Sequence, residues 1–228
     1  MAIAESTAGG GCAIEEISNA PAIGWQPLGE GRQAPAGSLR NPKLAALLAK
    51  YKEDVARHYQ SLPPGRIEQS LPPGRLIVSP KIDGETWFLH KDGHGTRLLS
   101  PTGRIIERIK LTIEAEHLLG GWQGLMAGEL YATVERGRPH VFDLHAALGG
   151  GPAATSQRLR WAAFDLLRDG DMNTQIPSFM QRTQRLQELL KRGRSIHAVA
   201  FEELDSGAAV REAFDRLVTR EGAEGIVV

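Results

Sequence analysis

Ser79-Pro-Lys81-Ile-Asp-Gly84 is the stretch on which the interpretation of this chain depends. Its lysine stands between the apolar run at residues 76–78 and an Asp-Gly pair that is typical of a turn. We expect this placement to put Lys81 at the end of a buried strand, where partial desolvation brings its neutral, nucleophilic form within reach. The sequence therefore predicts a lysine that attacks a substrate.

The composition is that of an ordinary globular protein. The chain has 228 residues, of which 41% are hydrophobic and 24% charged, which is enough apolar material for a buried core. Lys plus Arg and Asp plus Glu both number 27, so the net charge gives no indication of a nucleic-acid partner. A basic surface that binds nucleic acid would have to be a local patch. Cys12 is the single cysteine and no apolar run reaches the length of a membrane span. We therefore expect a cytoplasmic protein without disulfides or membrane contact.

Two regions can be separated along the chain. Residues 1–40 are rich in Gly, Ala, Pro and Ser and are expected to form a flexible N-terminal arm, and residues 41–228 to form one domain. Within the second region, just before the first expected strand, the sequence Ser61-Leu-Pro-Pro-Gly-Arg66 recurs as Ser70-Leu-Pro-Pro-Gly-Arg75. Loops tolerate such insertions, so we interpret the repeat as neutral; two basic loop tips that touch a phosphate backbone are the alternative.

Apolar periodicity and turn signals predict an α+β fold with antiparallel sheets flanked by helices. The expected helices cover residues 42–60, 111–119, 178–193 and 207–221. The expected strands cover residues 76–81, 85–91, 96–100, 125–131, 139–144, 158–167, 199–203 and 224–228. The last strand reaches the final residue, so we expect a truncated polypeptide.

Three further motifs follow the lysine stretch in order, each on an expected strand: Gly128-Glu-Leu-Tyr131, Phe164-Asp-Leu-Leu167 and Glu224-Gly-Ile-Val227. With residues 81–84, this set resembles the covalent nucleotidyltransferases, which comprise ATP-dependent DNA ligases, RNA ligases and messenger-RNA capping enzymes. The resemblance covers residues 76–228 and is nearest to the adenylation domain of ATP-dependent DNA ligases. It implies the ATP-grasp-like nucleotidyltransferase fold of those domains, without an OB-fold in this chain.

The resemblance implies a role for each motif. Lys81 would attack the α-phosphate of ATP and carry AMP, which then passes to a 5′-phosphate end before a 3′-hydroxyl seals the strand. Glu129 would hold the ribose, Phe164 would stack on the adenine, Ser79 would lie beside the adenine edge, and Glu224 would sit near the α-phosphate. The expected nucleotide-binding residues are Ser79, Lys81, Ile82, Asp83, Gly84, Arg104, Glu129, Phe164 and Glu224.

Magnesium is the expected metal, because it screens the triphosphate and stabilises the leaving pyrophosphate. It prefers oxygen ligands, which the carboxylates of Glu129 and Glu224 supply. The expected partner is nicked duplex DNA, bound by a monomer.

The sequence departs from the family pattern at three places. Thr86 and Pro101 stand where DNA ligases often have phosphate-binding arginines; Arg97 and Arg104 are candidates to replace them. The lysines of the family's last core motif do not follow within this chain. We therefore expect the polypeptide by itself to form the lysyl adduct poorly or not at all.

Other interpretations stay open at this point. Thr86 is compatible with an RNA ligase, and a capping enzyme would use GTP. The departures also fit a non-catalytic fold that binds nucleotide or nucleic acid without forming an adduct. Taken singly, Asp83-Gly84 is a plain turn and Phe164 an ordinary core residue. Glu129 is different, because a carboxylate on an apolar strand is costly without a partner.

Overall fold

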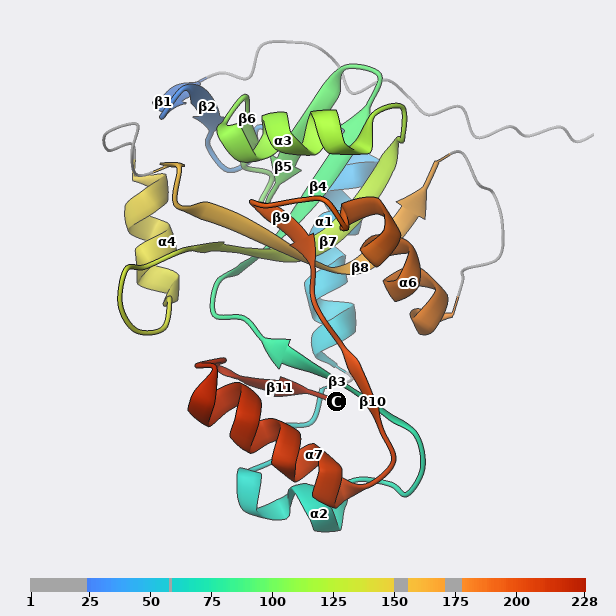
Figure 1. Ribbon diagram of the computed structural model, residues 1–228. Helices are drawn as coiled ribbons and strands as arrows, with labels where there is room; N and C mark the ends of the chain where they lie inside the picture. Colours follow the sequence, from blue (N-terminus) through green and yellow to red (C-terminus); the bar gives the residue numbers. More distant parts are fainter. Residues whose placement is uncertain (1–23, 58, 150–155, 171–177) are drawn as a thin grey trace, which may run out of the picture.

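An eight-stranded sheet carries most of the chain (Figure 1). The structure is a computed structural model that describes residues 24–57, 59–149, 156–170 and 178–228. The order of the sheet is β1-β2-β6-β5-β4-β7-β8-β9, and all neighbours are antiparallel except β8 and β9. The strands are β1 (Gln26–Leu28), β2 (Gly31–Ala34), β4 (Glu85–Asp92), β5 (Gly95–Leu99), β6 (Ile105–Glu107), β7 (Gly124–Ala132), β8 (Leu159–Asp169) and β9 (Ile196–Ala198).

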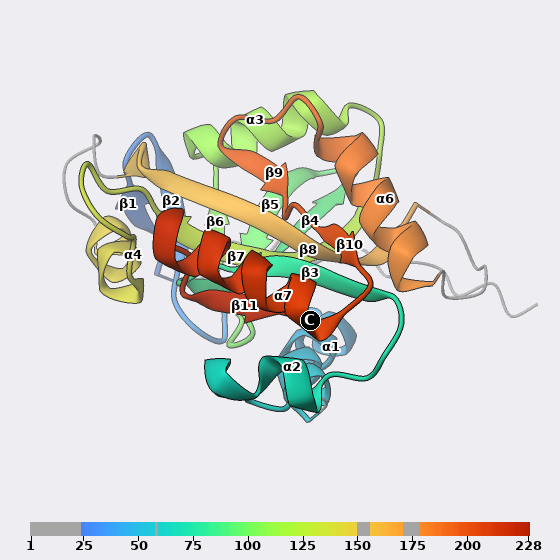
Figure 2. The same cartoon turned by 60° about the horizontal axis from the view of Figure 1, so that its bottom comes forward.

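A second sheet of three strands lies beside the first (Figures 1 and 2). Its central strand is β3 (Leu76–Lys81), with β10 (Glu202–Leu204) on one edge and β11 (Gly225–Val227) on the other, both antiparallel to β3. Helix α7 (Gly207–Phe214), its π-helical continuation η2 (Asp215–Arg220), the short helix α2 (Ile67–Ser70) and the turn η1 (Pro64–Arg66) accompany this sheet. Val78, Val210 and Leu217 belong to the separate apolar core that holds these elements together.

Helices cover the two faces of the large sheet unequally. Helices α3 (Lys110–Leu119), α4 (Val141–Leu148) and α6 (Phe179–Leu190) pack on one face, where Trp87 and Trp161 are fully buried. On the opposite face, α1 (Pro42–Ala56) packs through Leu48 against Phe88 and its neighbours. This second face also carries Tyr131, which lies over the small sheet rather than under α1.

The sequence predicted the α+β class and most elements correctly. Helix α1 begins after Asn41, whose side chain accepts a hydrogen bond of 2.9 Å from the Leu44 N–H, and α6 begins with a capping box of Ser178 and Gln181. Strand β3 covers residues 76–81 as expected. Local capping chemistry and apolar spacing therefore located these elements.

Two expectations about elements were wrong. Residues 139–144 were expected to form a strand, whereas α4 begins at Val141 and buries Leu144 and Leu148 in the main core. Residues 24–40 do not belong to a flexible arm, because β2 pairs with β6 and both Leu28 and Ala34 are buried. The remainder of the expected arm, residues 1–23 with Cys12, lies outside the described residues.

No helix in the described part of the chain is both long and apolar enough to cross a bilayer.

Candidate functional site

Lys81 is the last residue of β3 and lines a pocket. The side chain is 51% exposed and its ammonium forms an ion pair with the Glu224 carboxylate. The expectation of a desolvated lysine at the end of a buried strand is therefore wrong, because the strand end lies at the rim of a pocket. The Lys81 nitrogen is engaged with Glu224, so the ion pair has to open before this nitrogen acts as a nucleophile.

Glu224 reaches Lys81 through the register of the small sheet. Gly225 stands opposite Lys81 in the β11–β3 pairing, and the Glu224 N–H donates to the Lys81 carbonyl at 3.1 Å. The wide turns of η2 and the positive φ of Gly222 (78°) bring the chain back to β3 at this point. Two residues that are 143 positions apart in the sequence thus share one pocket.

Asp83 lies in the connection from β3 to β4 and has two cationic or polar neighbours. His140 Nδ1 is 3.0 Å from Asp83 Oδ2, and an Arg138 nitrogen lies 3.8 Å from the same oxygen. Both neighbours come from the segment that leads from β7 into α4. The carboxylate of the lysine motif therefore anchors that segment, which a plain Asp-Gly turn would not do.

Gly84 permits a close approach between this connection and β7. A Cβ at position 84 would lie 2.3 Å from the Leu130 carbonyl oxygen, and 3.1 Å from the Glu129 Cγ atom. No side chain fits at those distances, so the glycine of the motif is required by packing.

These residues line one pocket. Lys81, Ile82 and Asp83 form one side, and Glu224 and the residues before it form another. Ser79 lies two residues before Lys81 on β3, opposite Val227, and does not line the pocket. The full lining is Pro80, Lys81, Ile82, Asp83, Tyr131, Arg138, Pro139, Leu217, Glu221, Gly222, Ala223 and Glu224.

Glu129 projects from the same face of β7 as Tyr131, because side chains alternate along a strand. Tyr131 lines the Lys81 pocket, so Glu129 faces the same side of the sheet, next to the pocket lining. Its carboxylate accepts a 3.5 Å hydrogen bond from the Thr86 hydroxyl on the paired strand. Burial raises the pKa of Tyr131, which keeps its hydroxyl protonated.

Phe164 occupies a β-bulge. Ala127 of β7 pairs with Asp165 and Gly128 pairs with Ala163, so Phe164 between them has no partner in the ladder. Bulges re-aim side chains next to functional sites, and this one turns Phe164 toward the α1 face. There it is half-buried against the apolar cluster of Phe88 and Ala127. It is not part of the Lys81 pocket lining.

The two arginines considered as replacements for the family's phosphate ligands are engaged elsewhere. Arg104 donates to Gln33 Oε1 at 3.1 Å and stacks over Trp87, on the helix-covered face of the sheet. Arg97 forms a 2.8 Å ion pair with Asp92 in the β4–β5 hairpin. Neither lines the Lys81 pocket.

Sequence reasoning missed Arg138 and Tyr131 as members of this pocket, and His140 as a neighbour of Asp83. Arg138 and His140 follow a run of polar residues, and no periodicity marks them; only the fold of the segment before α4 brings them to Asp83. Tyr131 had a signal, because it ends the Gly-Glu-Leu-Tyr motif and lies on the Glu129 side of an alternating strand.

Magnesium fits this donor set only together with a nucleotide. Among the described residues no cluster of three or more His, Cys, Asp or Glu side chains is placed to hold a metal ion. Magnesium commonly uses one or two carboxylates plus substrate phosphates and water, so Glu224 and Glu129 are sufficient protein ligands in that arrangement.

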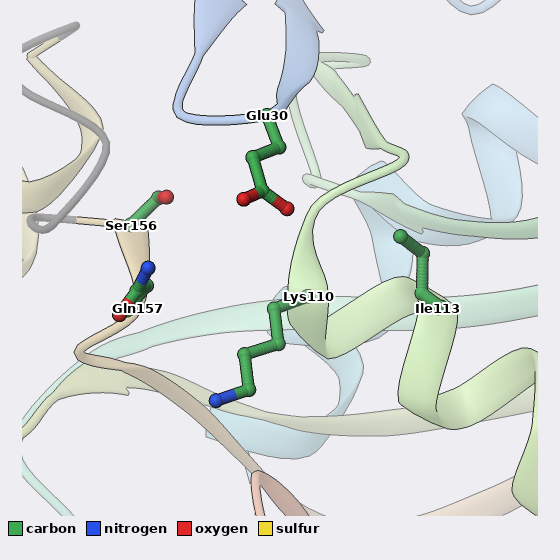
Figure 3. Close-up of a pocket in the computed structure, with 5 residues that line it drawn as sticks. All are labelled: Glu30, Lys110, Ile113, Ser156 and Gln157. Carbon is green, nitrogen blue, oxygen red and sulfur yellow. The ribbon is translucent and has the colours of Figure 1, made fainter.

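A second cavity lies apart from these residues (Figure 3). It is lined by Glu30 of the β1–β2 turn, Lys110 and Ile113 of α3, and the pair Ser156 and Gln157. The side chains of Glu30 and Lys110 point into the same open space. It contains none of the expected nucleotide-binding residues.

Comparison with known proteins finds the fold but little sequence identity. No family model and no curated protein sequence matches the chain. The solved structure Pmar-Lig_Pre. matches with a TM-score of 0.54 and 15% identity over 73% of this chain, and Pmar-Lig_PreS3 with 0.54 and 13% over 80%. The chain has a ligase nucleotidyltransferase fold. The predicted fold is thereby confirmed.

The matched region is part of a longer protein in each comparison. The chain spans 40% of the length of Pmar-Lig_Pre. and 46% of Pmar-Lig_PreS3. The ligase domain of M. tuberculosis LigD matches less well, with a TM-score of 0.47 and 21% identity over 67% of this chain and 46% of that one.

Proposed function

We propose that this chain is the nucleotidyltransferase core of an ATP-dependent polynucleotide ligase. The observation that carries the proposal is the pocket that Lys81 lines. In it, Lys81 forms an ion pair with Glu224, which lies 143 residues further along the chain, and Asp83 of the same motif also lines this pocket. A solvated surface lysine has no need of two motif carboxylates in the same pocket. The arrangement is suited to an amine that exchanges an ion pair for a phosphate.

ATP is the substrate of the first step. The ammonium of Lys81 leaves Glu224 and gives up a proton to solvent, and the neutral amine then attacks the α-phosphorus. A nitrogen–phosphorus bond forms, the bond to the bridging oxygen breaks, and pyrophosphate leaves. Pairing with Glu224 keeps the lysine aligned before ATP arrives, and the negative phosphates then compete with that carboxylate for the ammonium.

The other motif residues would hold the nucleotide. Glu129 faces the pocket side of β7 and would accept hydrogen bonds from the ribose hydroxyls. Phe164 would stack on the adenine, for which its bulge position leaves it half exposed. Ser79 and Ile82 flank Lys81 and would contact the base and sugar. When bound, magnesium would be held by Glu224 and Glu129 and would neutralise phosphate charge.

AMP would then pass from Lys81 to a 5′-phosphate end, and an adjacent 3′-hydroxyl would displace it to seal the strand. Nicked duplex DNA is the proposed substrate and a monomer the proposed state. RNA ends are the competing substrate, because Thr86 replaces an arginine of the DNA-ligase motif.

Covalent labelling tests the proposal. The chain is incubated with ATP and Mg²⁺ and its intact mass is measured for one added AMP, using Lys81→Ala as the blank. Lys110→Ala is the matched control, because that lysine lies in the other cavity. The proposal predicts an acid-labile adduct in the wild type and Lys110→Ala, at low yield for this polypeptide by itself, but none in Lys81→Ala. An adduct that persists in Lys81→Ala contradicts it, and so does a wild type that neither forms the adduct nor binds ATP.

A binding-only protein is the second candidate, favoured by the Lys81–Glu224 ion pair, which occupies the nucleophile. It predicts that ATP binds the wild type and Lys81→Ala with similar affinity and that the intact mass never changes. Sealing of nicked DNA compared with nicked RNA then separates the two kinds of ligase.

A further inference from the structure

Arg138 is the feature of the Lys81 pocket that no motif accounts for. Of the arginines in the described part of the chain, Arg138 is the one that lines this pocket. It lies between β7 and α4, outside the four motifs, and it is 36% exposed. The two positions where phosphate-binding arginines were expected hold Thr86 and Pro101. Apart from Lys81, Arg138 is therefore the cationic side chain among the residues that line the pocket.

The contacts of Arg138 leave its guanidinium available. Its distance to the Asp83 carboxylate is 3.8 Å, longer than a direct hydrogen bond, and its distance to His140 Nδ1 is 3.5 Å. His140 Nδ1 is itself 3.0 Å from Asp83 Oδ2, and a ring nitrogen that donates its proton to a carboxylate cannot also accept from an arginine. A guanidinium has five N–H donors, so these two long contacts leave most of its donor capacity available to a ligand.

The segment that carries Arg138 is held at both ends. At one end, the Thr133 N–H donates to the Arg158 carbonyl at 2.9 Å. At the other, the His140 N–H donates to Asp143 in the first turn of α4 at 2.9 Å. Arg138 is thus delivered to the pocket by an anchored segment, two residues from the point where Asp83 holds it through His140.

We propose that Arg138 binds a phosphate of the nucleotide in the Lys81 pocket and takes over the task of the missing motif arginines. This inference rests on the proposed function and adds to it the residue that recognises the phosphates. An arginine pairs with a phosphate through two parallel N–H···O bonds, which both attract and orient the group. Asp83 and His140 lie next to the guanidinium, in the pocket that Lys81 also lines and where the phosphates have to lie for attack.

Nucleotide binding measured by calorimetry tests the assignment. Wild type, Arg138→Gln and Arg138→Lys are titrated with ATP, AMP and adenosine. Loss of a charge-assisted hydrogen bond predicts that Arg138→Gln binds ATP and AMP about 10-fold to 100-fold more weakly, with adenosine affinity unchanged. Arg138→Lys keeps the charge without the planar fork, so a smaller loss is expected. Arg136→Gln is the matched control, since it removes the same charge from the same segment outside the pocket lining.

The outcomes separate this inference from the proposed function. An unchanged ratio of ATP affinity to adenosine affinity in Arg138→Gln overturns the assignment of Arg138 and leaves the proposed function standing. An equal loss in Arg136→Gln also overturns it, because the effect would then be one of general charge. A wild type that binds none of the three ligands overturns both proposals together.

Discussion

Gly84 links the lysine motif to the large sheet by the absence of a side chain. A Cβ there would lie 2.3 Å from the Leu130 carbonyl oxygen of β7, so the backbone of the connection and of the strand would have to separate. The motif glycine is therefore tied to the position of Glu129, one residue before Leu130, as well as to the turn after Asp83. A change at residue 84 is expected to affect packing first.

Gly84→Ala should destabilise the protein by about 1–3 kcal/mol, the usual cost of forcing an extra methyl group into a packed contact. Gly93→Ala is the control, because nothing lies within 4 Å of a Cβ at that hairpin glycine. Urea unfolding followed by circular dichroism measures both variants, and the control should stay within about 0.5 kcal/mol of the wild type. Equal stabilities of the two variants would show that β7 gives way easily at Leu130.

At the residue scale, the sequence predicted the pocket's motif members but not their environment. Lys81, Asp83 and Glu224 are brought together, since strand registers follow from apolar patterns that the sequence displays. Burial of Lys81 was predicted wrongly, because whether a strand end meets core or pocket depends on what the distant β11 segment brings. Arg138 was missed for the same reason.

Asp165 joins three elements. It lies on β8, accepts a 3.0 Å hydrogen bond from the Tyr51 hydroxyl of α1, and accepts a 2.6 Å bond from Arg182 Nε of α6. Burial, reinforced by the nearby Asp165 charge, raises the pKa of Tyr51, so the hydroxyl remains a donor. The half-buried carboxylate therefore ties a helix from each face of the sheet to the strand that carries Phe164.

Asp165→Ala is expected to cost about 2–4 kcal/mol of unfolding free energy, because a charged acceptor is removed from two partly buried donors. Tyr51→Phe removes one neutral donor and should cost about 1 kcal/mol. The double variant should cost less than the sum of the two, since both changes remove the same bond. Strictly additive urea-unfolding energies would show that the hydroxyl and the carboxylate do not interact.

At the element scale, elements with strong local signals were predicted and weak or context-dependent ones were not. Helix α1 and helix α6 carry capping side chains and a repeating apolar stripe. Strands β1, β2 and β6 have three or four residues each, too few for a period-2 pattern, and gain their stability from pairing across the sheet. Val141 and Phe142 favour strands intrinsically, yet burial of Leu144 and Leu148 on one side makes this segment a helix.

For the molecule as a whole, the site lies where two separately packed sheets meet. Lys81 and Glu224 belong to the small sheet, whereas Glu129, Tyr131 and Phe164 belong to the large one. Asp83-Gly84 lies in the segment that connects the two sheets. Gly84 packs closely against the large sheet, and Asp83 contacts the segment before α4 through His140. A substrate held by both groups of residues would therefore add contacts between the sheets, so ligand binding and the stability of the whole fold are coupled.

The stability of the whole fold in acid depends on several buried titratable groups. We expect His90 to make a large contribution to it. Burial lowers the pKa of His90 to about 4 from its usual 6.5; Asp92 opposes this shift, while Arg168 and Arg97 add to it. Arg168 lies 3.0 Å from His90 Nε2 and donates to it, which requires the neutral ring. The unfolded chain binds a proton near pH 6.5, whereas the folded protein resists it until about pH 4.

The stability that neutral His90 contributes is therefore complete above pH 6.5 and is lost as the pH falls toward 4, up to about 3 kcal/mol. Below that range, carboxylates take over. Burial of Glu114 raises its pKa, but hydrogen bonds from the N–H groups of Arg194 and Ser195 outweigh this and lower the pKa overall, so its contribution is lost as the pH drops below 4.5.

Urea unfolding at pH 7.5 and 5.0 should show the loss of the His90 contribution in the wild type. His90→Gln cannot titrate and keeps an acceptor for Arg168, so its stability should change less between the two pH values, whatever its stability at pH 7.5. An equal change in both proteins would mean that His90 does not control the acid sensitivity of this fold.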